Sequence, residues 1–270
     1  MILAKVKNVV ERASYQVNPR AIIVLGNPKT GSNAIASLLA EYCGISKTLD
    51  IPQLWSPVII NILEGKCNLA SVIRKHPKPF SRDLIKEPLL SLIFDQVKQT
   101  FPQSRYVFIS RDPRDNIRSI LNRLGVSGNL KEFGSEQKQL PDGWSESFNP
   151  KVLRTNYTHY IDILAHRWNL ITNVYLENRD DMILIRYEDF MQNKTGAIAA
   201  LARILRLPAI NDISEKVDIP YNSAGKDRDL PWETFFGSEN LQRIERICGS
   251  RLEIIHPALD KLAAPEMKTP

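Results

Sequence analysis

The sequence predicts an α/β fold in which helices cover a central parallel sheet. Residues 21–25 form an apolar run without alternation, as expected for a strand that is buried on both faces. Further β-favouring runs stand at 84–86, 105–110 and 182–186, and helical segments separate them. This order is typical of a parallel sheet. We expect the whole chain, 1–270, to form one domain, because 270 residues suffice for a single large core.

The turn after the first strand is the most informative stretch of the chain. Gly26 and Gly31 bracket four residues, and a helix is expected over 33–42. Glycines allow a tight turn, and the free N–H groups of the following helix face whatever the turn encloses. The stretch predicts either a phosphate-binding loop or an ordinary strand–helix connection with a chance lysine, Lys29.

A nucleotide-triphosphate P-loop has the same glycine spacing but ends in a Lys-Ser/Thr pair. Here Ser32 and Asn33 stand in place of that pair, and the lysine lies inside the loop as Lys29. In an NTPase the lysine contacts the β- and γ-phosphates and the hydroxyl binds Mg²⁺. The loop therefore indicates a phosphate-containing ligand held without the usual metal, and we expect no metal site.

The segments between the first strand and the 105–110 run follow a βαβ-like order. The pattern predicts a β segment at 47–51, a helix over 52–63 and a helix over 89–100. Residues 66–82 are expected to form a loop, because the sequence His76-Pro77-Lys78-Pro79 breaks any periodicity.

A second turn of interest follows the 105–110 run. Asp112 is expected to cap a helix that has Pro113 at its first position, which leaves Arg111 at the carboxyl end of the strand. Ser119 falls on the same helix face as Asp112, about two turns later. In a doubly wound sheet, ligands bind at the carboxyl ends of the strands, so this turn can approach the first one.

The second half of the chain is expected to be mainly helical. Residues 125–149 are rich in Gly, Ser and Pro and predict a mobile loop or lid. Helices are expected over 156–178, whose apolar stripe faces the core, over 195–205 and over 238–248. Segment 217–236 has little periodicity.

The composition indicates the charge of the ligand and the compartment that we expect. The net charge of +6 suits an anionic ligand, yet the basic residues are scattered rather than gathered in a tail. Three cysteines without CxxC spacing indicate neither disulfides nor zinc, which favours a reducing, cytoplasmic location. Residues 2–13 fit a short amphipathic helix, and no N-terminal apolar run is long enough for a signal peptide or a membrane span.

Three segments together carry a resemblance to a known family. They are PKTGSN at 28–33, RDPRDNIRS at 111–119 and RYED at 186–189, each placed after a predicted strand. Their order and sequence resemble the sulfotransferases that use 3'-phosphoadenosine-5'-phosphosulfate (PAPS), in particular bacterial and Golgi-type members. The resemblance covers residues 21–193. It implies a three-layer, P-loop-NTPase-like fold with a central parallel sheet.

The resemblance also implies an activity and two partners. The enzyme would move a sulfonyl group from PAPS to a hydroxyl or amine of an acceptor, with a carbohydrate or small molecule favoured, and release adenosine 3',5'-bisphosphate (PAP). No nucleic-acid partner is expected, because no basic stripe with interleaved aromatic residues is present. The sequence does not indicate the oligomeric state.

The family pattern assigns donor-binding roles to specific residues. The 5'-phosphosulfate would lie on the loop formed by Pro28, Lys29, Thr30, Gly31, Ser32 and Asn33. Arg111 and Ser119 would bind the 3'-phosphate, and Tyr187 would lie near the nucleotide. Lys226 and Arg228 belong to a late loop that would close over the nucleotide, although their surroundings do not match the family's Arg-Lys-Gly motif.

The candidate catalytic residues are those that could stabilise the negative charge formed in the reaction or accept the acceptor's proton. Lys29 is the candidate to neutralise the charge that develops on the bridging oxygen. The histidine-containing K-T-H motif of cytosolic members is replaced by Lys86-Glu87-Pro88, so Glu87 is the first candidate for the general base and His76 the second. Glu87 has an equally good interpretation as a capping or solvated glutamate.

Other interpretations stay open. A P-loop kinase or NTPase is the alternative enzyme, against which the displaced Lys29 and the absent Walker hydroxyl argue. A non-catalytic nucleotide-binding protein would use the same positive charge without turnover. Asp112, Arg114 and Asp115 are expected to form mainly a capping and salt-bridge cluster. Trp144 and Phe148 either contact the acceptor or anchor the 125–149 loop.

Overall fold

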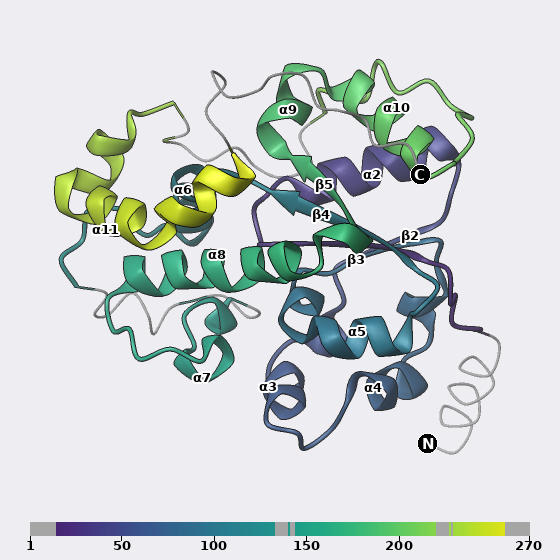
Figure 1. The fold of residues 1–270 in the computed structure, drawn as a ribbon, viewed down its shortest axis with the longest axis horizontal. Coiled ribbons are helices and arrows are strands. Elements are labelled where there is room, and N and C mark those ends of the chain that lie inside the picture. Colours follow the sequence, from purple (N-terminus) through teal and green to yellow (C-terminus); the bar gives the residue numbers. More distant parts are fainter. Residues whose placement is uncertain (1–14, 133–139, 141–143, 220–226, 228, 257–270) are drawn as a thin grey trace.

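A computed structural model of the chain describes residues 15–132, 140, 144–219, 227 and 229–256. At its centre lies a sheet of five parallel strands in the order β2-β3-β1-β4-β5 (Figure 1). The strands are β1 Ile22–Gly26, β2 Lys47–Leu49, β3 Leu84–Lys86, β4 Arg105–Ser110 and β5 Met182–Arg186. The predicted parallel α/β sheet is therefore confirmed.

Helices cover both faces of the sheet. Those of the described residues are α2 Ser32–Cys43, α3 Val58–Leu63, α4 Leu69–Lys75, α5 Phe94–Thr100, α6 Pro113–Leu124, α7 Pro150–Leu153, α8 Tyr160–Glu177, α9 Tyr187–Gln192, α10 Lys194–Ile204 and α11 Trp232–Ile255. Short 3₁₀ turns lie at η1 Pro52–Leu54, η2 Lys78–Ser81, η3 Pro88–Ile93, η5 Ser145–Ser147 and η6 Arg179–Asp181. In Figure 1, α2, α9 and α10 lie on one side of the sheet and α3, α4 and α5 on the other.

The alternation of side chains along β1 explains the layers. Ile23 and Leu25 pack into the core formed with α3, α4 and α5, whereas Ile22 and Val24 pack into the core formed with α2 and α10. All four side chains are at most 2% exposed. A strand with both faces buried carries no polar alternation, which is the pattern that residues 21–25 show.

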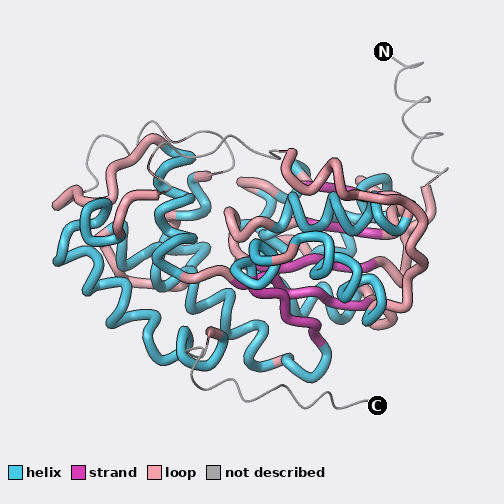
Figure 2. Tube along the Cα trace, turned by 90° about the horizontal axis from the view of Figure 1, so that it is seen from above, coloured by secondary structure: helices cyan, strands magenta, loops and turns pink. Residues whose placement is uncertain are grey.

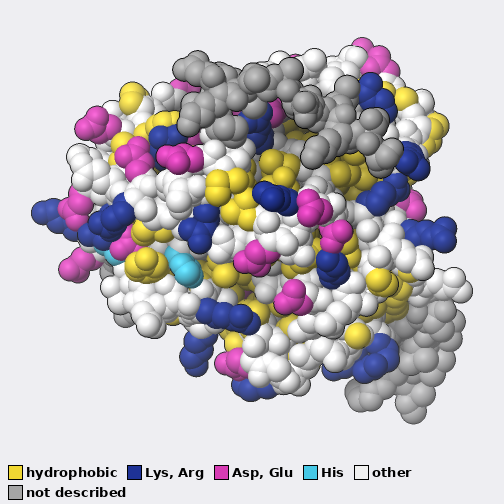
Figure 3. All heavy atoms as spheres, in the orientation of Figure 1, with side chains coloured by type: hydrophobic (Ala, Val, Ile, Leu, Met, Phe, Trp, Pro, Cys, Tyr) yellow, Lys and Arg dark blue, Asp and Glu magenta, His cyan; other side chains and the backbone are white. Residues whose placement is uncertain are grey.

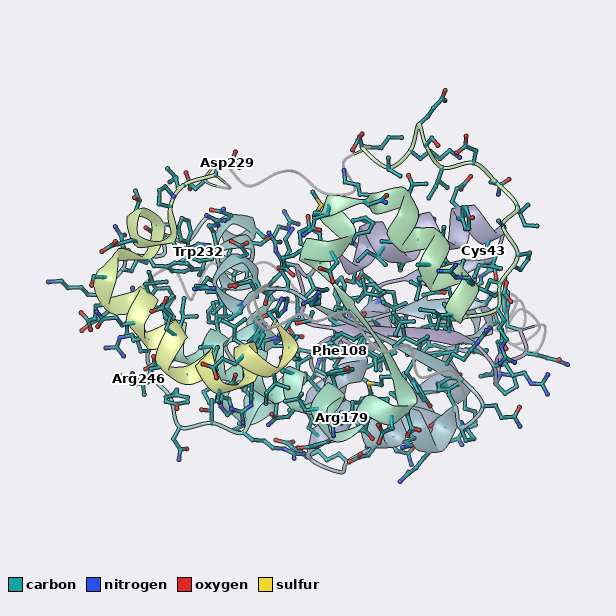
Figure 4. The ribbon with its side chains drawn as sticks, turned by 45° about the horizontal axis from the view of Figure 1, so that its top comes forward. Cys43, Phe108, Arg179, Asp229, Trp232 and Arg246 are labelled. Atoms are coloured by element: carbon teal, nitrogen blue, oxygen red, sulfur yellow. The ribbon has the colours of Figure 1, made fainter. Side chains whose placement is uncertain are left out.

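A third core lies beside the sheet and contains no strand of the described residues. It is formed by α6, α7, the first half of α8 and α11, and it includes Trp168 and Tyr160. Figure 2 shows this helical half next to the half that holds the strands. In Figure 4, Phe108 lies within the sheet, where it stacks on Tyr175 of α8 at 5.3 Å between ring centroids. The long helix α8 thus joins the two halves.

The prediction that residues 66–82 form a loop is wrong in part. Asn68 caps α4 by accepting a hydrogen bond from the Ser71 N–H at 2.9 Å. Leu69, Val72 and Ile73 of this helix are buried. The helix is only seven residues long and ends just before the prolines, so the prolines obscured it.

Two predicted helices are each divided into shorter pieces. The expected 52–63 helix consists of η1 and α3, and the expected 89–100 helix consists of η3 and α5. In the last third of the chain, α11 begins at Trp232, earlier than expected, and is interrupted at Gly237, whose φ is 71°. The expected helix over 2–13 lies outside the described residues.

Surface charge is mixed on the visible face. Figure 3 shows Lys and Arg side chains interspersed with Asp and Glu side chains, in keeping with the scattered basic residues of the sequence. Among the helices of the described residues, none combines the length and apolar character that a membrane span requires.

Candidate active site

The 28–33 loop leaves the central strand β1 and enters α2. Gly31 sits at the N-cap position of α2 with φ 85°, and Lys29 has φ 68°, a value that non-glycine residues rarely adopt. Gly26 is fixed by space, because a Cβ there would lie 2.4 Å from the carbonyl oxygen of Ile109. The loop therefore places the N-terminal end of a twelve-residue helix at the carboxyl end of β1. The free N–H groups of such a helix end favour an anion.

Side chains from the β4–α6 turn hold this loop in place. The Arg111 guanidinium donates from Nη1 to the carbonyl oxygen of Lys29 at 3.0 Å. The amide of Asn116 donates to the carbonyl oxygen of Pro28 at 2.8 Å. Within the loop, the Thr30 hydroxyl donates to the carbonyl oxygen of Asn27 at 2.9 Å. The two turns that the sequence placed at neighbouring strand ends thus meet directly.

Tyr187, at the start of α9, completes this arrangement. The Arg111 guanidinium lies 4.5 Å from the centroid of the Tyr187 ring, a cation–π distance. A Cβ at Gly31 would come within 2.4 Å of two carbons of the same ring. Behind Arg111, the Trp168 indole donates to the Arg111 carbonyl oxygen at 2.9 Å. The structure therefore brings together the 28–33 loop, Arg111 and Tyr187.

Ser119 lies on α6, half-buried. It follows Asn116 by three residues, so the two side chains share the helix face that contacts the loop. The neighbouring cluster is structural, as expected. Asp112 accepts hydrogen bonds from the Arg114 backbone N–H and from its guanidinium. Asp115 pairs with Arg118 at 2.6 Å.

The same cluster binds the start of α11. The Trp232 indole donates to Asp115 at 2.7 Å, and the Arg114 guanidinium lies 3.8 Å from the Trp232 ring centroid. In Figure 4, Trp232 lies between α11 and α6. The last long helix is therefore fastened to the helix that carries Ser119.

A cavity of about 250 Å³ opens beside the 28–33 loop. It extends from the loop to the carboxyl end of β3 and on to the η5 turn and α8. Its lining residues are Pro28, Lys29, Gly31, Ser32, Asn33, Asp50, Trp55, Lys86, Glu87, Pro88, Leu89, Arg123, Trp144, Glu146, Ser147 and Arg167. The strands β1 and β3 are neighbours whose following helices lie on opposite faces of the sheet, which is where α/β folds bind their ligands.

Lys29 lies in a strongly positive environment. Burial lowers the pKa of its ammonium group, and the charges of Arg123, Arg111 and Lys86 lower it further. Lys86, at the end of β3, is itself paired with Asp50 at 2.5 Å. An anion at the loop would relieve the repulsion that these cations impose on Lys29.

Glu87 both caps a turn and lines the cavity. Its carboxylate accepts hydrogen bonds from the backbone N–H groups of Leu89, at 3.0 Å, and Ile51, at 2.6 Å. The residue is 2% exposed, so it is not a solvated glutamate. Burial raises the pKa of this carboxyl, against the effect of the two backbone hydrogen bonds and Lys86. Each carboxylate oxygen keeps a second lone pair that can accept a proton.

The far wall of the cavity contains a buried arginine. Arg167 of α8 is 1% exposed and donates from Nη1 to the carbonyl oxygen of Glu146 at 3.3 Å. Its Nε has no hydrogen-bond partner among the described residues. Burial lowers the pKa of Arg167 to about 10, and the carboxylates of Glu146 and Glu87 act in the opposite direction.

The structure leaves one predicted site residue, His76, out of the cavity lining. His76 ends α4 as its C-cap and is not among the residues that line the cavity. Lys226 and Arg228 lie outside the described residues. No cluster of three or more His, Cys, Asp or Glu side chains that could hold a metal is found in the described part of the chain.

The two aromatic residues singled out in the 125–149 loop lie in different places. Trp144 lines the cavity, whereas Phe148 is 1% exposed and belongs to the helical core, where it anchors the segment. Another part of the loop is fastened, because the Tyr160 hydroxyl donates to the carbonyl oxygen of Gly128 at 2.7 Å. Residues 133–139 and 141–143 lie outside the described residues, so the mobile lid remains a prediction.

Several cavity residues were not predicted from the sequence. Trp55, Arg123, Glu146 and Arg167 each come from a different segment and carry no motif. One signal was available, since Arg167 is a charged residue directly before Trp168 in the apolar stripe of the long helix. A charge among apolar residues of a core helix often marks a polar site.

The middle of the chain matches one protein family. A family model described as "Sulfotransferase family" matches residues 59–212, which is more than half of the chain, although the 28–33 loop precedes the matched segment. No curated protein sequence matches the chain.

Two solved structures have a similar fold. Sulfotransferase STF9 from Mycobacterium avium has a TM-score of 0.56 at 11% identity, over 94% of this chain and 81% of that one. Mouse sulfotransferase SULT7A1, complexed with PAP, has a TM-score of 0.50 at 15% identity, over 91% of this chain and 88% of that one. At this identity the likeness concerns the fold, and it confirms the three-layer, P-loop-like architecture expected from the resemblance.

Proposed function

We propose that this chain, which belongs to the sulfotransferase family, takes its sulfonyl group from PAPS and transfers it to a hydroxyl or amine of a carbohydrate or other small acceptor. One observation carries the choice of donor. The 28–33 loop, Arg111 and Tyr187 are in direct contact, so the N-terminal end of a helix, a guanidinium and an aromatic ring are neighbours, with the lysine inside the loop. That arrangement suits a nucleotide with phosphates at both ends. The PAP complex of mouse SULT7A1 supports the same choice.

The donor would lie with its 5'-phosphosulfate on Pro28, Lys29, Thr30, Gly31, Ser32 and Asn33. Arg111 and Ser119, on the turn and helix that contact this loop, would hold the 3'-phosphate, and Tyr187 would pack near the nucleotide. The late-loop residues Lys226 and Arg228 are proposed to close over the donor. No resident metal is required, because Lys29 supplies positive charge where the bridging oxygen becomes negative.

Glu87 is our choice for the general base. It lines the same cavity as Lys29, and burial raises its pKa, which makes the carboxylate a stronger base. His76 is the second choice, and its place outside the cavity lining counts against it. In the transfer, the acceptor oxygen attacks sulfur in line with the departing 5'-phosphate while Glu87 receives the hydroxyl proton.

We also propose that residues 1–270 act as one sulfotransferase domain. Ile60, Leu63 and Leu92 pack against both the sheet core and the helical core, which supports a single unit. Cys43, Cys67 and Cys248 are all free thiols, which supports a reducing, cytoplasmic location.

Calorimetry with PAP, ATP and ADP, with and without Mg²⁺, tests the donor. We expect PAP to bind without metal and more tightly than ATP or ADP. The variant Arg111→Ala should lose about 1.5–3 kcal/mol, or roughly one to two decades of affinity, because it removes charge-assisted hydrogen bonds to phosphate. Arg179→Ala, an exposed arginine at the far end of α8, is the matched control and should bind PAP as the unmodified protein does.

The alternative is a P-loop kinase or NTPase. Tighter binding of ATP in the presence of Mg²⁺ than of PAP would refute the PAPS assignment and favour that alternative. Binding of PAP without any sulfonyl transfer, across glycans, phenols, lipids and peptides, would favour a non-catalytic nucleotide-binding protein.

A further inference from the structure

The cavity lining contains two tryptophans, Trp55 and Trp144, whose segments are joined by one hydrogen bond. The Glu146 carboxylate accepts from the backbone N–H of Ser56 at 2.6 Å. Ser56 directly follows Trp55, and Glu146 comes two residues after Trp144. Both tryptophans line the cavity and are half-buried. Two segments that lie about ninety residues apart in the sequence thus each bring one tryptophan to the same cavity.

Polar groups lie behind these indoles. Glu146, Ser147 and Arg167 are each at most 2% exposed and line the cavity. The Nε of Arg167 is buried and has no partner among the described residues, so this donor lacks a hydrogen bond that an acceptor molecule could supply. A buried polar group without a partner is costly, and a hydrogen bond to a ligand oxygen would remove that cost.

The charges that remain for the acceptor largely pair with one another. Lys86 pairs with Asp50, and the carboxylates of Glu146 and Glu87 act on Arg167. Lys29 and Arg123 repel each other and belong to the donor side of the cavity. A net negative acceptor would meet the carboxylates and a net positive acceptor would meet the cations. A wholly apolar acceptor would leave buried polar groups unpaired, which a site built for hydrogen bonding rejects strongly.

We propose that the acceptor is a neutral sugar, held on Trp55 and Trp144 and hydrogen-bonded through its hydroxyls to Glu146, Ser147 and Arg167. This inference rests on the proposed function and deepens it. Sugar hydroxyls both donate to carboxylates and accept from a guanidinium, which matches the mixed polar wall. The C–H face of a pyranose ring is apolar and packs against indole.

The transfer to such an acceptor balances without a further reactant. A sugar hydroxyl oxygen forms a new bond to the sulfur of PAPS. The bond from sulfur to the bridging oxygen of the 5'-phosphate breaks, and its electron pair stays on that phosphate as PAP leaves. The hydroxyl proton passes to Glu87, so the products are a sugar sulfate, PAP and one proton.

Two measurements test this acceptor class. The first is transfer of radiolabelled sulfonate from PAPS to N-acetylglucosamine and methyl glucoside (neutral), glucuronate (anion), glucosamine (cation) and 4-nitrophenol (aromatic). We expect at least tenfold higher kcat/KM for a neutral sugar than for the other three probes. The second is binding of the two neutral sugars by ligand-observed NMR, with and without PAP, which requires no turnover.

Variants locate the subsite. Trp55→Ala and Trp144→Ala should each raise KM for the sugar, or its Kd, about tenfold and leave the Kd of PAP unchanged. Arg167→Lys keeps the charge but loses the guanidinium geometry and should weaken the sugar in the same way. Tyr157→Ala removes an exposed aromatic residue that does not line the cavity, and it serves as the control with unchanged sugar binding.

These outcomes distinguish failure of the proposed donor from failure of the proposed acceptor. Failure of PAP to bind would overturn the proposed donor, whereas the sugar-binding measurement without PAP would still decide the acceptor class. Preference for glucuronate, glucosamine or 4-nitrophenol would overturn the neutral-sugar assignment. Absence of neutral-sugar binding, or wild-type sugar binding in both tryptophan variants, would overturn the subsite.

Discussion

Gly31 offers a sharp test of how the 28–33 loop is built. Its φ of 85° disfavours any side chain, and a Cβ would lie 2.4 Å from two carbons of the Tyr187 ring. Gly65 has a similar φ of 73°, but no heavy atom of the described residues lies within 4 Å of the position that its Cβ would take. The pair therefore separates the cost of the backbone conformation from the cost of the clash.

The magnitudes follow from these two terms. Gly65→Ala should lower the free energy of unfolding by about 1–2 kcal/mol, the cost of a left-handed conformation for a residue with a Cβ. Gly31→Ala should add an overpacking cost of about 1–3 kcal/mol, because Tyr187 is backed by Arg111 at 4.5 Å and has limited room to move. The total for Gly31→Ala is then about 2–5 kcal/mol.

Urea unfolding of both variants and calorimetry with PAP provide the assay. Gly31→Ala should also weaken PAP, since the loop must move away from Tyr187, whereas Gly65→Ala should bind PAP normally. In the double variant Gly31→Ala/Tyr187→Ala, the removal of the ring should recover the overpacking term. Equal destabilisation by the two alanines, or no recovery in the double variant, would refute this account of the loop.

Further predictions concern three residues of the same region. Lys29→Ala should lower kcat about 10²–10³-fold in single-turnover sulfonyl transfer, because preorganised positive charge at a developing oxyanion has that magnitude, and an unchanged kcat would remove Lys29 from the mechanism. Burial raises the pKa of Glu87, so kcat should fall as pH decreases through that raised pKa. Glu87→Gln should lower kcat sharply and leave a residual rate that lacks this acid limb in a pH–rate profile. The same raised pKa means that the stability contributed by Glu87 is present below its unfolded value and lost as pH rises through its folded one, which urea unfolding at several pH values measures against Glu87→Gln. Asp112→Ala should lower the free energy of unfolding by about 1–3 kcal/mol, through loss of the α6 cap and the paired Arg114, as read from thermal or urea unfolding.

The sequence predicted the sheet well, because each strand has a local signature. The runs at 84–86, 105–110 and 182–186 coincide with β3, β4 and β5. Their parallel order follows from the helices between them, and the carboxyl ends of parallel strands share one edge. That geometric fact explains why the turns after these strands come close to the 28–33 loop, whereas the roles of Arg111 and Tyr187 were expected from the family resemblance.

The helices were less predictable where they are short. The α4 helix has its own signals, an Asn68 cap and apolar residues at Leu69, Val72 and Ile73. The prolines that follow it are a stronger local signal and favour a loop. The division of the 89–100 segment depends on Glu87, whose side chain caps the 3₁₀ turn that begins at Pro88. Whether a glutamate caps a turn or faces solvent depends on tertiary contacts.

Most residues of the proposed acceptor side of the cavity could not be predicted from the sequence. The contact between Glu146 and the Ser56 N–H joins two segments that share no periodicity or motif. Arg167 reaches the cavity because α8 crosses from the helical core to the sheet core, which is a property of packing rather than of local sequence. Residues assembled by long-range packing leave no pattern in any one stretch of chain.

The position of β1 in the sheet also has a consequence for biosynthesis. This strand is central, and its two neighbours begin at Leu84 and Arg105. On the ribosome, the apolar strand is therefore made first and emerges with both edges unpaired. At a synthesis rate of about 5–20 residues per second, it waits on the order of ten seconds for its second neighbour. During that interval the nascent chain exposes an aggregation-prone edge, so we expect β1 to be the segment on which newly made chains most depend on chaperones.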